Sequence, residues 1–382
     1  MTPIRFIHTS DIHLDTSFSG AGLPSRLGDR KREAIRGTFR RILEDARRQS
    51  VDLVLIAGDL FEHDRVTPDT VEFLKQQFEN LDGIRVFIAP GNHDPCLRES
   101  PYCTEAWPEN VHIFREEEFR SVEMADTGVR VTGFGFAHSR LEEPIFQKLP
   151  VLPAEGWNLV LAHGSDVGCV PAGKAAHGPF TVGEISGKNV HYCALGHYHR
   201  QRPVLNPLDS ARIWYCGIPE GRAWDEEGAC GYLLGEIDGS GGIEVKSCPA
   251  SQYPLATITV DCDGYTSREQ IVDDILRRRG GAFDENTIVR VHLEGSLDPR
   301  LYLSTSEMEE RLAGAALFLA WENHTVPAID FAALANERTL CGYYVRSVNH
   351  QIAAAPAAER PVLERARLYG VQALLGREVR AR

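Results

Sequence analysis

Five short runs of metal-binding residue types follow one another in the first half of the chain. They are Asp11-Ile12-His13, Gly58-Asp59, Gly91-Asn92-His93-Asp94, His163-Gly164 and Gly196-His197-Tyr198-His199. Carboxylate, carboxamide and imidazole groups supply the mixed oxygen and nitrogen ligands that suit divalent transition metals. Any one run occurs by chance, but the ordered set is specific. It predicts a two-metal centre for chemistry at phosphorus.

The spacing within the runs suggests which residues share an ion. Asp11 and His13 are two residues apart at an expected strand end, so both side chains leave on the same face and can bind one metal. Asp59 is the expected bridge, because a carboxylate has two oxygens whereas one imidazole nitrogen serves a single ion. We expect the second ion to be held by Asn92, His163 and His197, with His199 returning to the first.

This ligand mixture favours Mn²⁺ as the metal, with Fe²⁺, Mg²⁺ or Zn²⁺ as alternatives, because Ca²⁺ prefers oxygen alone and structural zinc prefers thiolates. Two ions about 3.5–4 Å apart can hold a bridging hydroxide and neutralise the attacking and leaving oxygens of an in-line displacement. His93 is not needed as a ligand and is the candidate general acid. We expect Asp94 to orient its ring.

Strand ends must position these runs. Strands are predicted at 4–8, 51–57, 85–89, 129–136, 158–162, 192–195, 213–216 and 232–237. Helices are predicted at about 28–49 and 68–80, the second with Thr67 as N-cap and Pro68 in its first turn. This alternation predicts an α/β fold, in which ligands bind at the carboxyl ends of the strands.

The length of 382 residues exceeds what one core usually supports, so we expect more than one domain. We predict a main domain at 1–250, a small α+β domain at 251–330 and a helical tail at 331–382. The small domain should contain strands at 256–260 and 287–293 and helices at 267–279 and 306–318. A last helix from Pro361 onward either packs on its own domain, which we favour slightly, or docks in a partner's groove.

Composition further narrows the class of protein to which this chain can belong. No run approaches the roughly 18 apolar residues that a membrane span needs. The start lacks the pattern of a signal peptide, so we expect a cytoplasmic protein. The nine cysteines include no Cys-x-x-Cys pair, which fits neither a disulfide framework nor a zinc knuckle.

The net charge of −13 argues against a nucleic-acid partner, since phosphates are bound chiefly by Lys and Arg. Residues 26–48 are an exception, with nine basic against four acidic side chains. They form either a track for DNA or the solvated face of an amphipathic helix. We favour the solvated face, because Ile35, Phe39 and Ile42 recur at helical spacing.

At these residues the chain resembles the calcineurin-like metallophosphoesterase superfamily, and more narrowly the bacterial DNA-repair exonucleases of the SbcD and YhaO type. The resemblance covers about residues 4–330. It also rests on Thr9-Ser10-Asp11-Ile12-His13-Leu14, Gly58-Asp59-Leu60-Phe61, Ala89-Pro90-Gly91-Asn92-His93-Asp94 and Tyr215-Cys-Gly-Ile-Pro-Glu-Gly-Arg222. It implies a four-layer α/β/β/α sandwich with a small α+β cap and a helical tail.

The resemblance also implies roles for single residues. One metal would be bound by Asp11, His13, Asp59 and His199. The other would be bound by Asp59, Asn92, His163 and His197. His93 would be the catalytic residue. It further implies that the segment 251–330 faces DNA, an SMC-like coiled-coil ATPase as partner, and a homodimer. One departure is Glu62, where some relatives place a histidine directly after the Gly-Asp-Leu-Phe run.

The leading hypothesis is therefore a Mn²⁺-dependent phosphodiesterase acting on DNA, an exonuclease or endonuclease subunit in DNA repair. The alternative is a metallophosphodiesterase or phosphatase for nucleotides or other small phosphoesters. A non-catalytic binding module is a third hypothesis, which the intact ligand set disfavours. Histidines outside the five runs, including His292 and His324, are interpreted as structural, and His177 as only a minor candidate for substrate contact.

Overall fold

The computed structural model describes residues 3–18, 25–170, 175–206, 212–228, 230–298, 301, 303–376 and 379. The chain forms two compact units. The first comprises Met1–Thr257 together with Ala282–Val289 and Ala316–Phe318. The second comprises Ile258–Gly281, Arg290–Ala315 and Leu319–Arg382.

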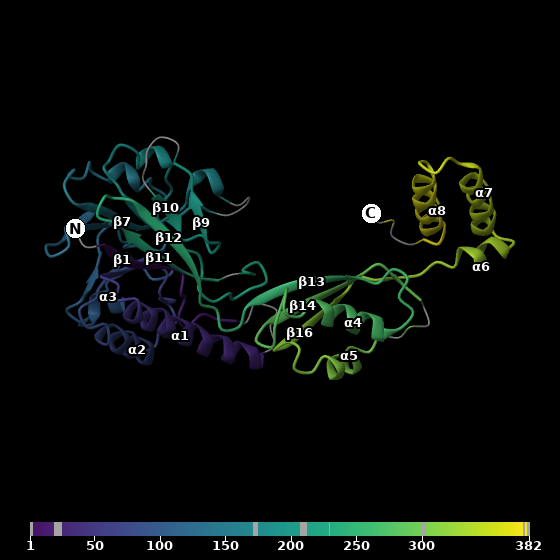
Figure 1. Ribbon diagram of the computed structural model, residues 1–382, viewed down its shortest axis with the longest axis horizontal. Helices are drawn as coiled ribbons and strands as arrows, with labels where there is room; N and C mark the ends of the chain where they lie inside the picture. The colour runs from purple at the N-terminus through teal and green to yellow at the C-terminus, as the bar shows by residue number, and fades with distance from the viewer. Residues whose placement is uncertain are drawn as a thin grey trace. The chain divides into compact units, whose positions relative to one another are not determined.

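The first unit contains two six-stranded sheets. The order in the first sheet is β12 (Ile243–Pro249), β11 (Gly231–Ile237), β1 (Ile4–Thr9), β2 (Leu53–Ile56), β3 (Arg85–Ile88) and β4 (Val111–Ile113). Strands β1 to β4 are parallel, whereas β11 and β12 are antiparallel additions at one edge. Figure 1 shows β1, β11 and β12 side by side.

The second sheet is also parallel at its centre. Its order is β5 (Arg120–Met124), β6 (Val129–Gly133), β7 (Trp157–His163), β8 (Tyr192–Gly196), β10 (Arg212–Tyr215) and β9 (Arg202–Val204). Strands β6, β7, β8 and β10 run parallel, and the two edge strands are antiparallel to their neighbours.

Alternating side chains build the layers. On one face of the first sheet, Ile7 and Val54 belong to a core shared with helices α1 (Ser25–Arg48) and α2 (Pro68–Glu79). On the other face, Phe6 and Leu53 belong to the core between the two sheets, which also contains Leu161 of the second sheet. The other face of the second sheet is covered by irregular chain with the 3₁₀ turns η1 (Phe146–Lys148), η2 (Val167–Cys169) and η3 (Val182–Glu184). The predicted layered α/β class is confirmed.

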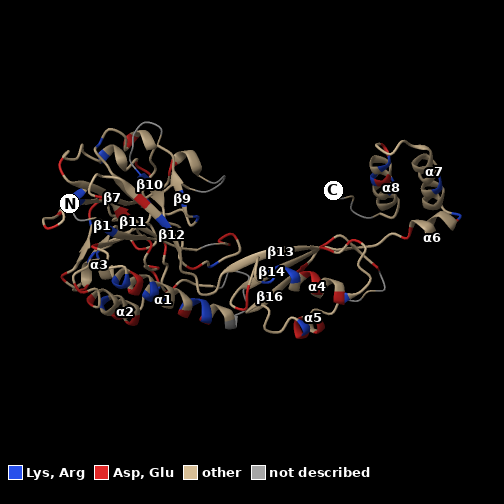
Figure 2. Cartoon of the chain, in the orientation of Figure 1, with Lys and Arg blue, Asp and Glu red and all other residues tan. Residues whose placement is uncertain are grey.

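The predicted helix features are also confirmed. In α1, Ile35, Phe39 and Ile42 are buried, whereas most of its arginines are exposed: Arg30, Arg32, Arg40, Arg47 and Arg48. Figure 2 shows Lys and Arg along this helix. Thr67 caps α2, its hydroxyl accepting a hydrogen bond from the backbone N–H of Thr70. A four-residue helix, α3 (Pro101–Thr104), follows the third motif run.

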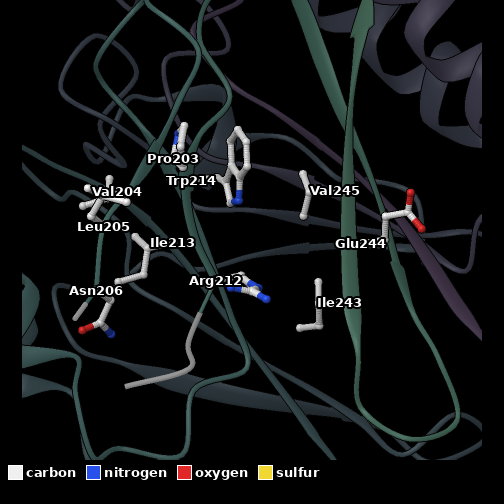
Figure 3. Close-up of a pocket in the computed structure, with 10 residues that line it drawn as sticks. All are labelled: Pro203, Val204, Leu205, Asn206, Arg212, Ile213, Trp214, Ile243, Glu244 and Val245. Carbon is white, nitrogen blue, oxygen red and sulfur yellow. The ribbon is translucent and has the colours of Figure 1, made fainter. Parts of the chain in front are cut away.

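Strands β10 and β12 belong to different sheets but line one hollow of about 400 Å³ (Figure 3). Trp214 and Arg212 approach it from β10, and Ile243 and Val245 from β12. None of the predicted site residues lines it, so this hollow is separate from the candidate chemistry.

The second unit contains most of a three-stranded sheet, in the order β13 (Leu255–Asp261), β14 (Ile288–Glu294) and β16 (Phe318–Asn323). It also contains α4 (Arg268–Arg278), α5 (Thr305–Arg311), and the short pair β15 (Ser296–Leu297) and β17 (Val326–Pro327). The predicted helix at 306–318 is wrong at its end. Helix α5 ends at Arg311, Gly314 beyond it has a left-handed φ of 74°, and Phe318 begins β16.

Three helices complete the second unit: α6 (Phe331–Asn336), α7 (Leu340–Ala354) and α8 (Arg360–Leu374). Helices α7 and α8 lie side by side (Figure 1) and bury Val345 against Val371. The last helix therefore packs on its own unit. No helix among the described residues is long and apolar enough to cross a membrane.

Candidate metal centre

The five motif runs stand at the carboxyl ends of parallel strands from both sheets. Asp11, Asp59 and Asn92 follow β1, β2 and β3 of the first sheet, while His163 ends β7 and His197 follows β8 of the second. Because these strand ends open to the same side, residues far apart in the sequence converge on one place.

The backbone at the site is unusual. Asp11, His13, Asp59 and His197 all have positive φ, at 54°, 52°, 53° and 103°. Non-glycine residues rarely adopt this conformation, and such strain gathers at functional sites. Gly58 has a φ of 84°, and a Cβ there would lie 2.5 Å from Nδ1 of His163, so only glycine fits.

Asp11, His13 and His199 form the first ligand group. Their ligand atoms all lie within 4.8 Å of one another. Nε2 of His199 is 3.8 Å from Oδ1 of Asp11. The carboxylate of Asp11 is fully buried and accepts hydrogen bonds from the backbone N–H of His197 at 3.1 Å.

Asp59 lies between the two groups, as a bridging ligand should. Its Oδ2 is 3.8 Å from Nε2 of His13 and 3.4 Å from Nε2 of His163. Its Oδ1 accepts a hydrogen bond of 2.8 Å from the backbone N–H of His93. That bond fixes the carboxylate so that Oδ2 faces both imidazoles.

Asn92, His163 and His197 form the second group. Oδ1 of Asn92 is 3.0 Å from Nε2 of His163 and 3.2 Å from Nδ1 of His197. Nδ1 of His163 donates a 2.9 Å hydrogen bond to the carbonyl of Ala57, so in the neutral ring Nε2 carries a lone pair. The lone pair of this Nε2 then faces Oδ1 of Asn92, and a cation between the two atoms would satisfy both.

The other imidazoles are also presented as ligands. Nδ1 of His13 donates to Glu62 at 2.8 Å, and Nδ1 of His199 donates to Glu226 at 2.6 Å. Such carboxylate partners are typical of metal-binding histidines, because they fix the ring and its tautomer. Nε2 of His13 thereby faces the carboxylate of Asp59, and Nε2 of His199 faces that of Asp11.

The residues present therefore fit a pair of divalent ions. Nε2 of His13 is buried and has no hydrogen-bond partner among the described residues, which costs folding free energy unless a ligand is bound. Burial lowers the pKa of His13 to about 4 and that of His197 to about 3, so both rings are neutral at pH 7 and offer lone pairs.

Comparison with known families agrees with this geometry. The family model described as calcineurin-like phosphoesterase matches residues 4–201, which include all five runs. The chain belongs to the calcineurin-like phosphoesterase family. The predicted family is thus confirmed, and with it a hydrolase of phosphoesters that uses two divalent ions.

Curated relatives of this phosphoesterase include DNA-repair proteins. It is 31% identical over 307 residues to the uncharacterized metallophosphoesterase YhaO of Bacillus subtilis, covering 78% of this chain and 73% of the relative. It is 29% identical over 326 residues to the DNA double-strand break repair protein Mre11 of Methanopyrus kandleri, covering 77% and 69%. It is 23% identical over 233 residues to one subunit of the nuclease SbcCD of Staphylococcus epidermidis, covering 53% and 59%.

The phosphoesterase holds His93 in a way that the sequence prediction missed. Nδ1 of His93 donates a 2.8 Å hydrogen bond to Glu62, and not to Asp94 as expected. This bond raises the pKa of His93 to about 9. The His93 side chain is 45% exposed, whereas His13 beside it is buried, so His93 lies at the rim of the ligand group.

Asp94 instead ties two motif runs together. It is fully buried and accepts hydrogen bonds from the backbone N–H groups of Asp59, Leu60 and Gly91 at 2.9, 2.8 and 2.6 Å. The hydroxyl of Tyr102 donates a fourth, at 2.7 Å. These bonds occupy its oxygens, so Asp94 positions the backbone of the phosphoesterase site rather than the ring of His93.

Arg222 is a further residue that sequence reasoning did not single out. Its guanidinium lies 3.5 Å from Glu62 and 3.3 Å from Glu226, the two carboxylates that orient His13 and His199. The only signal was its place at the end of the Tyr215–Arg222 run. His177, the minor candidate for substrate contact, lies with its ring 5.6 Å from that of His197.

Proposed function

We propose that this phosphoesterase is a Mn²⁺-dependent DNA phosphodiesterase, a nuclease or nuclease subunit in DNA repair. The observation that carries the proposal is the half-exposed imidazole of His93, held by Glu62 at the rim of a buried group of metal ligands. The choice of DNA is supported by relatives named as a double-strand break repair protein and as part of a nuclease.

In this proposal Asp11, His13, Asp59 and His199 hold one ion, and Asp59, Asn92, His163 and His197 hold the other. Bound there, the ions would supply an activated water and neutralise charge on the phosphoryl oxygens. Mn²⁺ is our choice because every ligand is an oxygen or a nitrogen and no thiolate takes part.

His93 would donate a proton to the departing alkoxide. Its ring centroid is 4.8 Å from that of His13, and its Nδ1 is bonded to Glu62, so Nε2 is the nitrogen left to face a substrate. Glu62 contacts both His93 and His13, so it would position the proton donor relative to the first ion.

An arginine-lined hollow beside α1 favours an extended anionic substrate. It has a volume of about 680 Å³, and four arginines and Tyr253 line it together with three acidic residues: Arg30, Arg32, Arg36 and Arg40 against Asp15, Asp29 and Glu33. Arg30 lies over the ring of Tyr253 at 5.3 Å. Cationic and aromatic groups of this kind bind single-stranded nucleic acid without sequence preference.

The proposal includes the domain roles and partners that the resemblance implied. The segment 1–250 would carry the nuclease site, 251–330 would face DNA and 331–382 would form a helical tail. One relative is itself named as one subunit of a nuclease, which supports a partner protein. We propose an ATPase of the SMC-like coiled-coil kind and a homodimer.

The test is cleavage of end-labelled linear DNA by the purified chain with Mn²⁺, Mg²⁺ or EDTA, alongside an aryl phosphodiester. We expect Mn²⁺-dependent cleavage, reduced roughly 10²–10⁴-fold in His93→Ala while bound metal is retained. The matched control is His138→Ala, since His138 is also exposed and also bonded to a glutamate, Glu117. Hydrolysis of the aryl ester with intact DNA would contradict the nuclease assignment and favour small phosphoesters.

A further inference from the structure

A second group of metal-binding side chains meets on the three-stranded sheet, in residues of the second unit. His292 lies in β14, Glu322 lies near the end of β16, and His324 follows that strand directly. The backbone N–H of His324 donates a 2.8 Å hydrogen bond to the carbonyl of Leu293, which fixes the register. Glu322 and His324 are two residues apart in extended chain, so their side chains share a face.

The three side chains are arranged as ligands would be. Oε2 of Glu322 lies 3.0 Å from Nε2 of His292 and 3.4 Å from Nε2 of His324. One ligand atom from each residue lies within 4.8 Å of the other two. The two rings meet edge to face, with centroids 5.6 Å apart, so both Nε2 atoms turn toward the same carboxylate oxygen.

Two observations go beyond the 3.4 Å hydrogen bond between Nε2 of His324 and Oε2 of Glu322. Nε2 of His292 is buried, and it makes no hydrogen bond with any residue that the structure describes. Arg290 lies 3.6 Å from the other oxygen of Glu322, Oε1. The guanidinium thus holds the carboxylate from one side and leaves Oε2 to the two imidazoles.

We propose that His292, Glu322 and His324 bind a third divalent ion, of the Zn²⁺ class. Two imidazole nitrogens and one carboxylate oxygen are a ligand set that binds zinc with one position left open. Calcium and magnesium fit poorly, because they prefer oxygen ligands. This site is independent of the two-metal centre and of the proposed nuclease activity.

The open position would face a cavity. His292 and His324 both line a space of about 1000 Å³, together with Asp263, Glu294 and Ser296. A water molecule or an anionic oxygen from a bound molecule can therefore reach the fourth position. The ion would hold β14 and the end of β16 in register and present a Lewis-acidic position to this cavity.

Zn²⁺ stoichiometry tests the proposal. The full chain carrying His13→Gln, Asp59→Asn and His163→Gln, which together change at least one residue in each of the other candidate ligand groups, is stripped of metal and titrated with Zn²⁺ alone. We expect one equivalent of Zn²⁺ to bind. Changing a residue that only contacts a metal ligand typically lowers metal affinity about 10–100-fold, and we expect His324→Gln to lower the Zn²⁺ affinity by more than that. His350→Gln, a change of an exposed histidine outside the group, should leave it unchanged.

Failure of the background variant to bind Zn²⁺, or unchanged binding in His324→Gln, would overturn the proposal. Co²⁺ gives a second readout, in which a band gained by a variant, unlike a band lost, is not imitated by a folding defect. We expect visible absorption bands of a low-coordinate Co²⁺ ion, lost in His324→Gln. His324→Cys should restore binding and add a sulfur charge-transfer band, and absence of that band would contradict direct coordination by residue 324.

Discussion

The carboxylate of Glu62 accepts a 2.8 Å hydrogen bond from Nδ1 of His93. Its other oxygen accepts one of 2.8 Å from Nδ1 of His13. One side chain therefore positions both a proposed metal ligand and the proposed proton donor. Removing it should affect metal binding and catalysis together.

We expect Glu62→Ala to lower turnover of an aryl phosphodiester and to weaken metal binding, the latter about 10–100-fold, because His13 loses the partner that fixes its ring. Steady-state kinetics at saturating metal, with metal titrations, measure the two effects. Glu117→Ala is the control, since Glu117 pairs with His138. Normal metal affinity in Glu62→Ala would contradict the role at His13.

Asp94→Asn should act on stability. The amide would place an NH₂ group against a site surrounded by donors, including the N–H groups of Asp59, Leu60 and Gly91. Tyr102→Phe removes a single hydrogen bond to a charged group, so we expect it to lower the free energy of unfolding by about 1.5–3 kcal/mol. We expect Asp94→Asn to lower the free energy of unfolding by more than Tyr102→Phe does. Urea unfolding measures both. An Asp94→Asn protein of normal stability but low turnover would favour a direct catalytic role instead.

Lys31 and Glu220 form a buried ion pair in the first unit, both almost fully inaccessible. We expect Lys31→Met to lower the free energy of unfolding by about 3–5 kcal/mol, because Glu220 is left charged and buried. The double variant Lys31→Met, Glu220→Gln should recover part of that loss. Arg32→Met breaks an exposed pair with Asp29 and should cost about 1 kcal/mol or less. Equal losses from Lys31→Met and Arg32→Met would contradict this account.

Thiol reactivity should divide the cysteines by burial. Burial raises the pKa of Cys193, and burial together with Cys103 raises that of Cys96 to about 12. A higher pKa lowers the thiolate fraction at pH 8, and the thiolate is the reactive species. In the reduced native protein, Ellman's reagent should react rapidly with the exposed Cys103 and Cys169 and slowly with Cys96 and Cys193. Rapid loss of all four thiols would show that the first unit opens readily.

The arginine-lined hollow predicts a salt-dependent effect on DNA alone. We expect Arg30→Ala with Arg40→Ala to weaken DNA binding and reduce the slope of log affinity against log salt by about 0.7–0.9 per lost phosphate contact. Hydrolysis of an aryl ester should not change. Arg47→Ala, a change of an exposed arginine outside the hollow, is the control. Unchanged DNA affinity in the double variant would return these arginines to the role of a solvated helix face.

The residues that the sequence proposed as metal ligands do lie close together, and each stands within a short run at the end of a strand. Hydrophobic periodicity located β1, β2 and β3, and the residues after them could be read directly as chemistry. The partner of His93 was missed because Asp94 is adjacent in sequence, whereas Glu62 reaches the ring only through the fold. Adjacency in the chain is a poor guide to which side chains meet in a turn.

Other features depend on strand pairing, which local patterns do not specify. His292 and Glu322 come together because β14 and β16 are neighbours in one sheet. The predicted helix at 306–318 ran too far because its apolar residues suit a helix as well as a strand. Tertiary pairing decided for β16, beginning at Phe318.

The origin of the ligands on two sheets has a consequence for how the protein assembles. Asp11 follows β1 of the first sheet, whereas His199 follows β8 of the second sheet. Neither proposed metal position therefore exists until both sheets have formed and packed together. Loop closure over this length of chain is slow, and metal capture should come last in folding. Newly made chains would therefore remain inactive toward phosphoesters until both sheets are in place.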